Sequence, residues 1–292
     1  MRFAKGHGTG NDFLILADPD GAMVPSPDLV ASLCDRHTGL GADGILRAVR
    51  ASTVGHGPAA AEWFMDYRNA DGSLAEMCGN GIRVFARYLL GRGLADGPEF
   101  AVATRAGLRR VREEAGGEIT VDMGAPTVTG HSTAAIGSSR YEGLEVSLGN
   151  PHLACLVDRP VAELDLSAPP LIDHGRFPDG ANVEVVRVRG ERHLEMRVYE
   201  RGSGATLSCG TGAVAAAVAG AAAAPATVGP AARNGWGRPA GTWTVQVPGG
   251  TLIVTLTGTT SLLTGPAVII AEGELDEAWL ATLAGAAALA TV

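Results

Sequence analysis

Lysine is almost absent from this chain, because Lys5 is the single lysine among 23 lysine and arginine residues. Enzymes that depend on pyridoxal phosphate hold it through a lysine Schiff base. Lys5 lies in a strand-like opening stretch, Arg2 to Lys5, which is a poor place for that lysine. The sequence therefore argues against pyridoxal phosphate chemistry, and we expect the protein to need no cofactor.

Paired cysteines are also missing. The four cysteines, at positions 34, 78, 155 and 209, form no CxxC pair and no spacing typical of metal ligands. The sequence predicts neither a disulfide framework nor a metal site, so each thiol has to be interpreted from its own surroundings.

Long apolar runs and an excess of positive charge are absent as well. The longest apolar run, Ala213 to Ala224, is shorter than the roughly 18 residues of a membrane span, and it predicts a buried helix. No targeting segment opens the chain, so we expect a cytoplasmic protein that does not enter a membrane. A net charge of −8 argues against a nucleic-acid partner.

Length and patterning predict two globular domains of mixed α/β class. The 292 residues are 46% hydrophobic and 18% charged, which suits two domains of ordinary size. Apolar segments in the first half predict strands at Phe13–Ala17, Ile45–Val49 and Glu62–Tyr67 and a helix at Pro27–Arg36. Later segments predict strands at Ile119–Met123, Leu144–Leu148, Leu153–Val157, Val183–Val188, Leu194–Tyr199 and Ala267–Ala271. We also expect a helix end followed by a surface loop within Ala219–Gly241 and a helix from about Asp276 to Leu289. Because βαβ alternation is lacking, antiparallel pairing is favoured.

One short pattern occurs twice. Met77-Cys78-Gly79-Asn80-Gly81 and Ser208-Cys209-Gly210-Thr211-Gly212 are each a Cys-Gly-x-Gly turn that leads into an apolar helical stretch. After Cys78, one helical face is apolar (Ile82, Phe85, Ala86, Leu89), and Arg83 and Arg87 lie off it. The repetition predicts two similar halves, each with a cysteine at the start of a central helix.

Two such cysteines suit the inversion of a carbon centre. A thiol at a helix N-terminus meets the positive end of the helix dipole, which is expected to lower its pKa. Racemisation without a cofactor needs one group to remove a proton from one face of a carbon and another to return a proton to the opposite face. The glycine-rich helix starts add backbone N–H donors for the substrate carboxylate, from Gly79, Asn80, Gly210 and Thr211.

Several longer motifs resemble those of the diaminopimelate epimerase family over nearly the whole chain, in its actinobacterial form. They are Lys5-Gly6-His7-Gly8-Thr9-Gly10-Asn11-Asp12-Phe13, Gly39-Leu40-Gly41-Ala42-Asp43-Gly44, Met65-Asp66-Tyr67-Arg68, Arg68-Asn69-Ala70-Asp71-Gly72-Ser73, Cys78-Gly79-Asn80-Gly81, Gly149-Asn150-Pro151-His152, Phe177-Pro178 with Asn182, and Tyr199-Glu200-Arg201-Gly202 leading to Cys209-Gly210-Thr211-Gly212. Several ordered motifs are far more specific than any one of them.

The resemblance implies an α/β (α+β) fold of two similar domains, each a mostly antiparallel sheet wrapped around a central helix. Residues 1–124 with 265–292 would form the domain that carries Cys78, and residues 125–264 the domain that carries Cys209. It further implies a homodimer and diaminopimelate as the substrate.

The resemblance also implies roles for individual residues. Cys78 and Cys209 would be the acid and the base, with His152 and Glu200 close to the reacting carbon. The rest of the substrate-binding set would be Asn11, Asn69, Asn150, Asn182 and Arg201, which would hold the non-reacting amino-acid end, Arg201 through paired hydrogen bonds to a carboxylate.

One departure from the family pattern leaves alternatives open. The family usually has a glutamate where this chain has Ala205, which puts the fine substrate preference in question. A related two-cysteine racemase acting on another amino acid is the first alternative. A ligand-binding protein built on Gly6-His7-Gly8-Thr9-Gly10, or a thiol redox protein, is a more distant one, because the glycine run leads into a strand and the cysteines are far apart.

Overall fold

The computed structural model describes residues 1–55, 61–223 and 240–289. Its contacts divide the chain into two compact units, Met1–Ile119 with Ala267–Val292, and Thr120–Pro266. These limits lie close to the domain limits expected from the sequence, 124/125 and 264/265. The assignment of the two units as domains stays a prediction.

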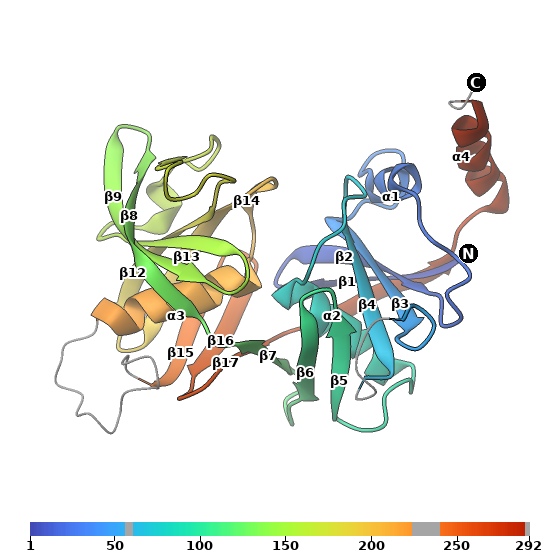
Figure 1. The fold of residues 1–292 in the computed structure, drawn as a ribbon, viewed down its shortest axis with the longest axis horizontal. Helices are drawn as coiled ribbons and strands as arrows, with labels where there is room; N and C mark the ends of the chain where they lie inside the picture. The colour runs from blue at the N-terminus through green and yellow to red at the C-terminus, as the bar shows by residue number, and fades with distance from the viewer. Residues whose placement is uncertain (56–60, 224–239, 290–292) are drawn as a thin grey trace. The chain divides into compact units, whose positions relative to one another are not determined.

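The first unit is a mixed sheet with helices (Figure 1). Its strands, in the order of their pairing, are β18 (Val268–Glu274), β1 (Arg2–Gly8), β2 (Asn11–Ala17), β3 (Gly44–Arg50), β4 (Trp63–Asn69), β5 (Glu99–Thr104) and β6 (Gly107–Glu113). The helices are α1 (Pro27–Cys34), α2 (Gly79–Gly91) and α4 (Glu277–Leu289). Along this order the β2–β3 and β4–β5 pairs are parallel, and the other successive pairs are antiparallel.

The second unit is built in the same manner. Its strands, in the order of their pairing, are β11 (Leu171–Ile172), β8 (Thr127–Ile136), β9 (Ser139–Ser147), β10 (Pro151–Leu156), β12 (Asn182–Gly190), β13 (His193–Glu200), β15 (Gly241–Val247), β16 (Gly250–Leu256), β17 (Ser261–Gly265) and β7 (Ile119–Gly124). The short β14 (Gly204–Thr206) also pairs with β13, and a 3-10 turn spans Val161–Glu163. The helix of this unit is α3 (Gly210–Ala223).

The two units repeat one topology. From β1 to β6 the successive pairs are antiparallel, parallel, antiparallel, parallel and antiparallel. The pairs β9–β10, β10–β12, β12–β13, β13–β15 and β15–β16 follow the same order. In each unit the central helix, α2 or α3, precedes the strand that closes the second parallel pair. The prediction of two similar sheet-and-helix halves is therefore confirmed.

Both central helices are largely buried. In α3 every residue from Gly210 to Ala221 is buried, as its uniform alanine and valine composition predicts. Gly220 lets this helix approach its sheet, because a Cβ there would lie 2.9 Å from the Trp243 ring. In α2, Gly79–Ala86 and then Tyr88 and Leu89 are buried.

Most predicted strands and both predicted flanking helices are present within a few residues of their expected limits. Several strands were not predicted, namely β5, β6, β8, β11 and β14–β17. The helix end predicted within Ala219–Gly241 is present, since α3 extends to Ala223. The surface loop predicted after it falls on residues 224–239, outside the described part of the chain. In the described ranges no helix is long and apolar enough to cross a membrane.

Candidate active site

Cys78 is the N-cap of α2. Its backbone is extended (φ −134°, ψ 125°), and its Sγ accepts a hydrogen bond from the backbone N–H of Gly81 at 3.4 Å. The sulfur thus takes the place that a serine or aspartate oxygen commonly occupies at a helix start. The backbone carbonyl of Cys78 accepts from Ile82 N–H at 2.9 Å, which begins the helix.

Cys209 stands in the same position before α3. Its Sγ accepts from Gly212 N–H at 3.4 Å, and its carbonyl accepts from Ala213 N–H at 2.9 Å. A second contact joins the Cys209 Sγ to the Thr211 hydroxyl at 3.5 Å. The sequence repeat therefore corresponds to a repeated local geometry.

A chain of hydrogen bonds passes Cys78 in the first unit. Arg83 Nη2 donates to Asn80 Oδ1 (3.0 Å), Asn80 Nδ2 donates to Asn11 Oδ1 (3.2 Å), and Asn11 Nδ2 donates to Asp43 Oδ2 (2.7 Å). The Cys78 Sγ lies 3.6 Å from the same Asn11 Oδ1. Asn11 and Asn80, both predicted site residues, are thus in contact beside the predicted catalytic thiol.

The two ends of this chain determine the orientation of both amides. A guanidinium can only donate hydrogen bonds and a carboxylate can only accept them. Arg83 therefore requires the oxygen of Asn80 to face it, and Asp43 requires the nitrogen of Asn11 to face it. The amide oxygen of Asn11 is left facing Cys78, so the thiol meets a hydrogen-bond acceptor.

Arg83 lies off the apolar face of α2 in the sequence pattern, yet the structure buries it completely. Its Nη1 donates to Gly79 O at 3.0 Å, and its Nη2 also reaches the Thr9 hydroxyl at 3.4 Å. Burial lowers the pKa of Arg83 to about 10, in spite of the interactions with Cys78 and Glu118 that raise it. The group stays charged at neutral pH, and it is a fixed cation at the start of α2.

His152 and Glu184 form a fully buried pair in the second unit. The His152 Nδ1 lies 2.7 Å from Glu184 Oε1, and its Nε2 lies 3.1 Å from Asn150 Oδ1. Asn150 Nδ2 in turn donates to the Thr211 hydroxyl at 3.3 Å, which is in contact with Cys209. The predicted residues His152, Asn150, Thr211 and Cys209 are therefore connected.

Glu184 was not predicted as a site residue from the sequence, and its burial lowers the stability of the fold. Among the described residues its Oε2 is a buried oxygen with no hydrogen-bond partner, which costs about 1–3 kcal/mol or more. A Cβ at Gly212 would lie 2.7 Å from Glu184 Oε1 and 3.2 Å from the Cys209 Cβ. Glycine is therefore needed for the carboxylate to approach the start of α3.

Glu200 lies at the end of β13 and accepts a hydrogen bond from the Thr206 hydroxyl. Burial raises the pKa of Glu200, and hydrogen bonds from Thr206 and Cys209 oppose the shift only in part. Burial and the nearby Glu200 and Glu184 also raise the pKa of the Cys209 thiol well above its usual range. The expectation that the helix start would lower this pKa is wrong for Cys209, because desolvation and two carboxylates outweigh the dipole.

The remaining predicted site residues lie near the strand ends. Asn182 is buried, donates to Pro151 O at 3.3 Å and accepts from the Arg201 backbone N–H at 2.9 Å. The Arg201 side chain is exposed. Asn69, at the end of β4, donates to the Ser73 hydroxyl at 3.0 Å.

The glycine-rich run near the N-terminus makes a hairpin turn. Thr9 and Gly10 have positive φ values of 51° and 83° and join β1 to β2, as expected of a two-residue hairpin loop. Lys5, on β1, pairs with Asp12 at 3.0 Å and donates to Leu40 O at 3.2 Å. These contacts give the run and the single lysine structural roles.

Three contributors to the site were missed by sequence reasoning: Arg83, Asp43 and Glu184. Glu184 offered a signal, since it is the one acidic residue inside the predicted apolar strand Val183–Val188. A charge inside a buried strand is seldom tolerated without a partner. In the described ranges no cluster of histidine, cysteine or acidic side chains has a geometry that could hold a metal ion.

Comparison with known proteins supports one family. The sequence model of the diaminopimelate epimerase family matches residues 3–129 and 145–270. A protein named diaminopimelate epimerase from Thermobifida fusca is 56% identical over 282 residues, covering 94% of this chain and 98% of that protein. One from Mycobacterium tuberculosis is 49% identical over 297 residues, covering 96% and 98%.

Solved structures share the fold at low sequence identity. A PhzF-family phenazine biosynthesis protein from Bacillus anthracis has a TM-score of 0.69 at 16% identity, covering 94% of this chain and 99% of the other. A probable proline racemase from Agrobacterium radiobacter has a TM-score of 0.65 at 14% identity, covering 94% and 93%. These similarities show the two-unit α+β architecture alone.

The relatives and the family model cover nearly the whole chain, including both cysteine turns, Cys78–Gly81 and Cys209–Gly212. The chain spans almost the full length of these relatives, so the match is not limited to a shared part. This chain is therefore an isomerase that belongs to the diaminopimelate epimerase family.

Proposed function

We propose that this chain interconverts LL- and meso-2,6-diaminopimelate by a two-base mechanism, as a step of lysine and cell-wall precursor biosynthesis. The observation that carries the proposal is the pair of cysteines, Cys78 and Cys209, each of which caps a central helix at the equivalent place of a repeated topology. Family membership supports the substrate, because the curated relatives carry that name.

In the proposed reaction one cysteine, as thiolate, removes the α-proton of the substrate. The other cysteine, as thiol, gives its proton to the opposite face of the same carbon. The charge that develops on the substrate carboxylate would be met by the backbone N–H groups of Gly79, Asn80, Gly210 and Thr211 at the helix starts. After one turnover the two sulfurs have exchanged protonation states, so the reverse reaction can follow directly.

Glu200 would accept the thiol proton of Cys209, and His152 would lie beside the reacting carbon. The Glu200 carboxylate is hydrogen-bonded to the Cys209 thiol and has a raised pKa, so it is a suitable acceptor for the thiol proton. The ring of His152 is held between Glu184 and Asn150 and cannot rotate without breaking one of these contacts. A fixed ring suits a residue that lies beside the reacting carbon.

The non-reacting amino-acid end of the substrate is assigned to Asn11, Asn69, Asn150, Asn182 and Arg201. Arg201 supports this assignment because its side chain is exposed, while its backbone is fixed by Asn182. A guanidinium can bind a carboxylate with two parallel hydrogen bonds.

The test is solvent isotope exchange. The purified protein is given LL- or meso-diaminopimelate in heavy water, with no cofactor added and with a chelator present, and α-deuterium and stereoisomers are measured. We expect both isomers to form and each inversion to place deuterium at the α-carbon that is inverted. A requirement for pyridoxal phosphate or for a metal would contradict the proposal.

The same assay separates the alternatives. Lysine, glutamate, histidine and proline are tested beside diaminopimelate. Exchange with one of these amino acids and not with diaminopimelate would identify a related racemase and would give Ala205 a role in substrate choice. No labelled α-carbon in any of them would favour a binding or redox protein. Cytoplasmic location and a homodimer stay predictions, which fractionation and light scattering would check.

A further inference from the structure

A buried group of charges lies on one face of the first sheet. Arg47 of β3 is opposite Asp66 of β4 in the strand register, and both are nearly inaccessible. Side chains alternate between the faces of a strand, so Phe64, Asp66 and Arg68 share one face of β4. The opposite face carries Tyr67, whose ring packs edge-on against Phe13.

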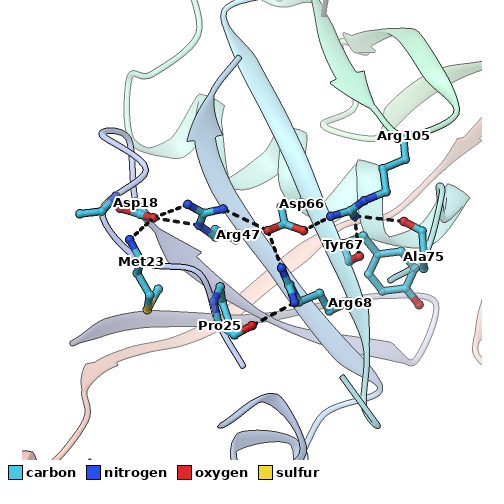
Figure 2. Close-up of polar contacts among 10 residues, drawn as sticks. Asp18, Met23, Pro25, Arg47, Asp66, Tyr67, Arg68, Ala75 and Arg105 are labelled. Atoms are coloured by element: carbon cyan, nitrogen blue, oxygen red, sulfur yellow. Dashed lines mark hydrogen bonds and ion pairs between the residues drawn. The ribbon is translucent and has the colours of Figure 1, made fainter. Parts of the chain in front are cut away.

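Asp66 accepts hydrogen bonds from three arginines (Figure 2). The contacts are Arg47 Nη1 to Oδ2 at 3.1 Å, Arg68 Nη2 to Oδ2 at 3.5 Å, and Arg105 Nη2 to Oδ1. Asp18 completes this group, at 2.7 Å from Arg47 Nη2. We call these five residues, Asp18, Arg47, Asp66, Arg68 and Arg105, the Asp66 cluster.

Each branch of the Asp66 cluster ends on the backbone of a loop. The Asp18 carboxylate accepts from the N–H groups of Ala22 (2.9 Å) and Met23 (3.0 Å). Arg68 Nη1 donates to Pro25 O at 2.9 Å. These two branches hold the segment that leads into α1.

The third branch reaches the segment before Cys78. Arg105 Nη1 donates to Tyr67 O at 2.9 Å and to Ala75 O at 3.3 Å, and its guanidinium lies 5.7 Å from the centre of the Phe64 ring. Ala75 N–H also donates to Tyr67 O at 3.2 Å. Arg105 therefore joins the end of β4 to a residue three positions before Cys78 (Figure 2).

Stability alone is a weak explanation of the Asp66 cluster. The desolvation cost of buried charges commonly equals or exceeds their attraction, and apolar residues of similar size often serve stability as well or better. The cluster also holds three guanidiniums against two carboxylates, so its charge is not balanced internally. What apolar residues could not provide is the set of directed hydrogen bonds to the N–H groups and carbonyls of the loops.

We propose that Asp66 and Arg105 are positioning residues for Cys78: the carboxylate orients the guanidinium, and the guanidinium holds the 70–78 segment so that Cys78 enters α2 with its sulfur over the Gly81 N–H. The proposal rests on the proposed function for its catalytic consequence. The geometric part, that Arg105 restrains this segment, can be tested without any substrate.

The experiment compares Arg105→Met with Arg50→Met in the full-length protein. Arg50 is the matched control, since it also pairs with a carboxylate, that of Glu62, and lies 5.1 Å from the centre of an aromatic ring, that of Trp63. Hydrogen–deuterium exchange of the 70–81 peptide, kcat and KM, and thermal stability are measured for both. Arg105→Lys tests partial rescue, because an ammonium keeps the charge and lacks the fork.

We expect Arg105→Met to raise amide exchange selectively in residues 70–81 and to lower kcat by about 10- to 100-fold with a smaller change in KM, since misplacement of a reacting group by about 1 Å can cost that much. Arg105→Lys should lie between Arg105→Met and the wild type, and Arg50→Met should resemble the wild type. Unchanged exchange, or a rise spread evenly over the first unit, would overturn the proposal.

Asp66→Asn adds a second variant. It should raise exchange in the same peptide, because the orientation of Arg105 is lost. If Asp66→Asn fails to fold, the amide exchange of Arg105→Met alone tests the proposal. If the wild type does not act on diaminopimelate, the proposed function fails, and the exchange data still decide the positioning role of Arg105.

Discussion

The starts of α2 and α3 have the same backbone geometry and different electrostatic surroundings. In both, a cysteine sulfur accepts from the N–H three residues later at 3.4 Å. Cys78 has an amide oxygen and a buried guanidinium near it, from Asn11 and Arg83. Cys209 has two carboxylates near it, those of Glu200 and Glu184, which together with burial raise its pKa.

This difference shows that a helix start does not by itself determine the acidity of a thiol. The dipole contribution is typically below about 1 kcal/mol at exposed sites, and a neighbouring buried charge can exceed it. The proposed reaction needs the two thiols in opposite protonation states, which they exchange at each turnover. The different neighbours of the two helix starts influence which thiol ionises more readily in the free protein.

The largest expected effect comes from removing either thiol. Cys78→Ala and Cys209→Ala should each lower epimerisation by about 10³-fold or more, because each thiol serves one face of the carbon and neither can replace the other. Conversion of LL- to meso-diaminopimelate is the measurement. Near-normal turnover in either variant would mean that the replaced cysteine is not required, and the two-cysteine assignment would be wrong.

Cys34→Ala and Cys155→Ala are the matched controls. Burial raises the pKa of both thiols to about 12, and both lie in apolar surroundings. They should keep their turnover and lose only some stability. Loss of activity in a stable Cys34→Ala or Cys155→Ala protein would argue against assigning the chemistry to the helix-start cysteines.

The fold could be predicted where the pattern is local. The continuous apolar run of Phe13–Ala17 and the alanine-rich stretch Ala213–Ala224 identify a buried strand and a buried helix directly. The strand β6 (Gly107–Glu113) contains three arginines and is largely exposed, so it shows little apolar signal. It is placed by its hairpin with β5, which turns at Arg105 and Ala106, because its own apolar pattern is too weak to mark a strand.

The candidate site divides in the same manner. Cys78 and Cys209 are recognisable because the helix-start motif is five residues long. Arg83, in contrast, is buried by a partner 74 residues away, Thr9, and Glu184 by one 32 residues away, His152. Burial of a charge depends on such distant partners, so periodicity placed Arg83 off the apolar face and gave no reason to expect a buried charge there.

The next largest effect should come from reducing the negative charge near Cys209. Glu184→Gln should lower kcat by about 10²-fold, since it frees the His152 ring from a charged partner. It should also move the midpoint of Cys209 alkylation to lower pH, because one of the charges that raise this pKa is gone. Iodoacetamide rates against pH, in a Cys78→Ala background, measure this directly.

Glu145→Gln is the control for that experiment. Glu145 is also buried in the second unit, where it pairs with Arg176 at 2.8 Å, and it is not among the groups that shift Cys209. An equal shift of the Cys209 midpoint in Glu145→Gln and Glu184→Gln would show a general effect of charge and would remove the specific role of Glu184.

A smaller effect should follow when Cys78 is given the surroundings of Cys209. Asn11→Asp places a carboxylate beside the Cys78 sulfur, so its alkylation midpoint should move to higher pH, measured in a Cys209→Ala background. Turnover, measured with Cys209 present, should fall about 10-fold. Asp43→Asn is the control, because it changes the same hydrogen-bond chain and leaves the amide of Asn11 next to the thiol. If Asp43→Asn moves the midpoint as far upward as Asn11→Asp, contact with the sulfur is not what matters.

The smallest expected effect is on the pH dependence of stability. Asp66 in the first unit and Glu200 in the second should change stability in opposite directions as the pH rises. Burial raises the pKa of Asp66, but hydrogen bonds and charges of its arginines outweigh burial and bring it below the usual 3.8. Its contribution to stability is therefore present above pH 3.8 and is lost as the pH falls through the folded-state pKa.

Glu200 should act in the opposite direction. Its pKa is raised above the usual 4.5, mainly by burial, so its contribution is fully present below pH 4.5 and is lost as the pH rises through the folded-state pKa. The glutamine of Glu200→Gln cannot ionise. The melting temperature of this variant should therefore rise relative to that of the wild type by a few degrees between pH 4.5 and neutrality. Thermal denaturation at steps across this range measures the difference. A melting-temperature difference between Glu200→Gln and wild type that is constant over the range would show that Glu200 ionises as easily in the folded chain as in the unfolded one, and the contrast with Asp66 would then be lost.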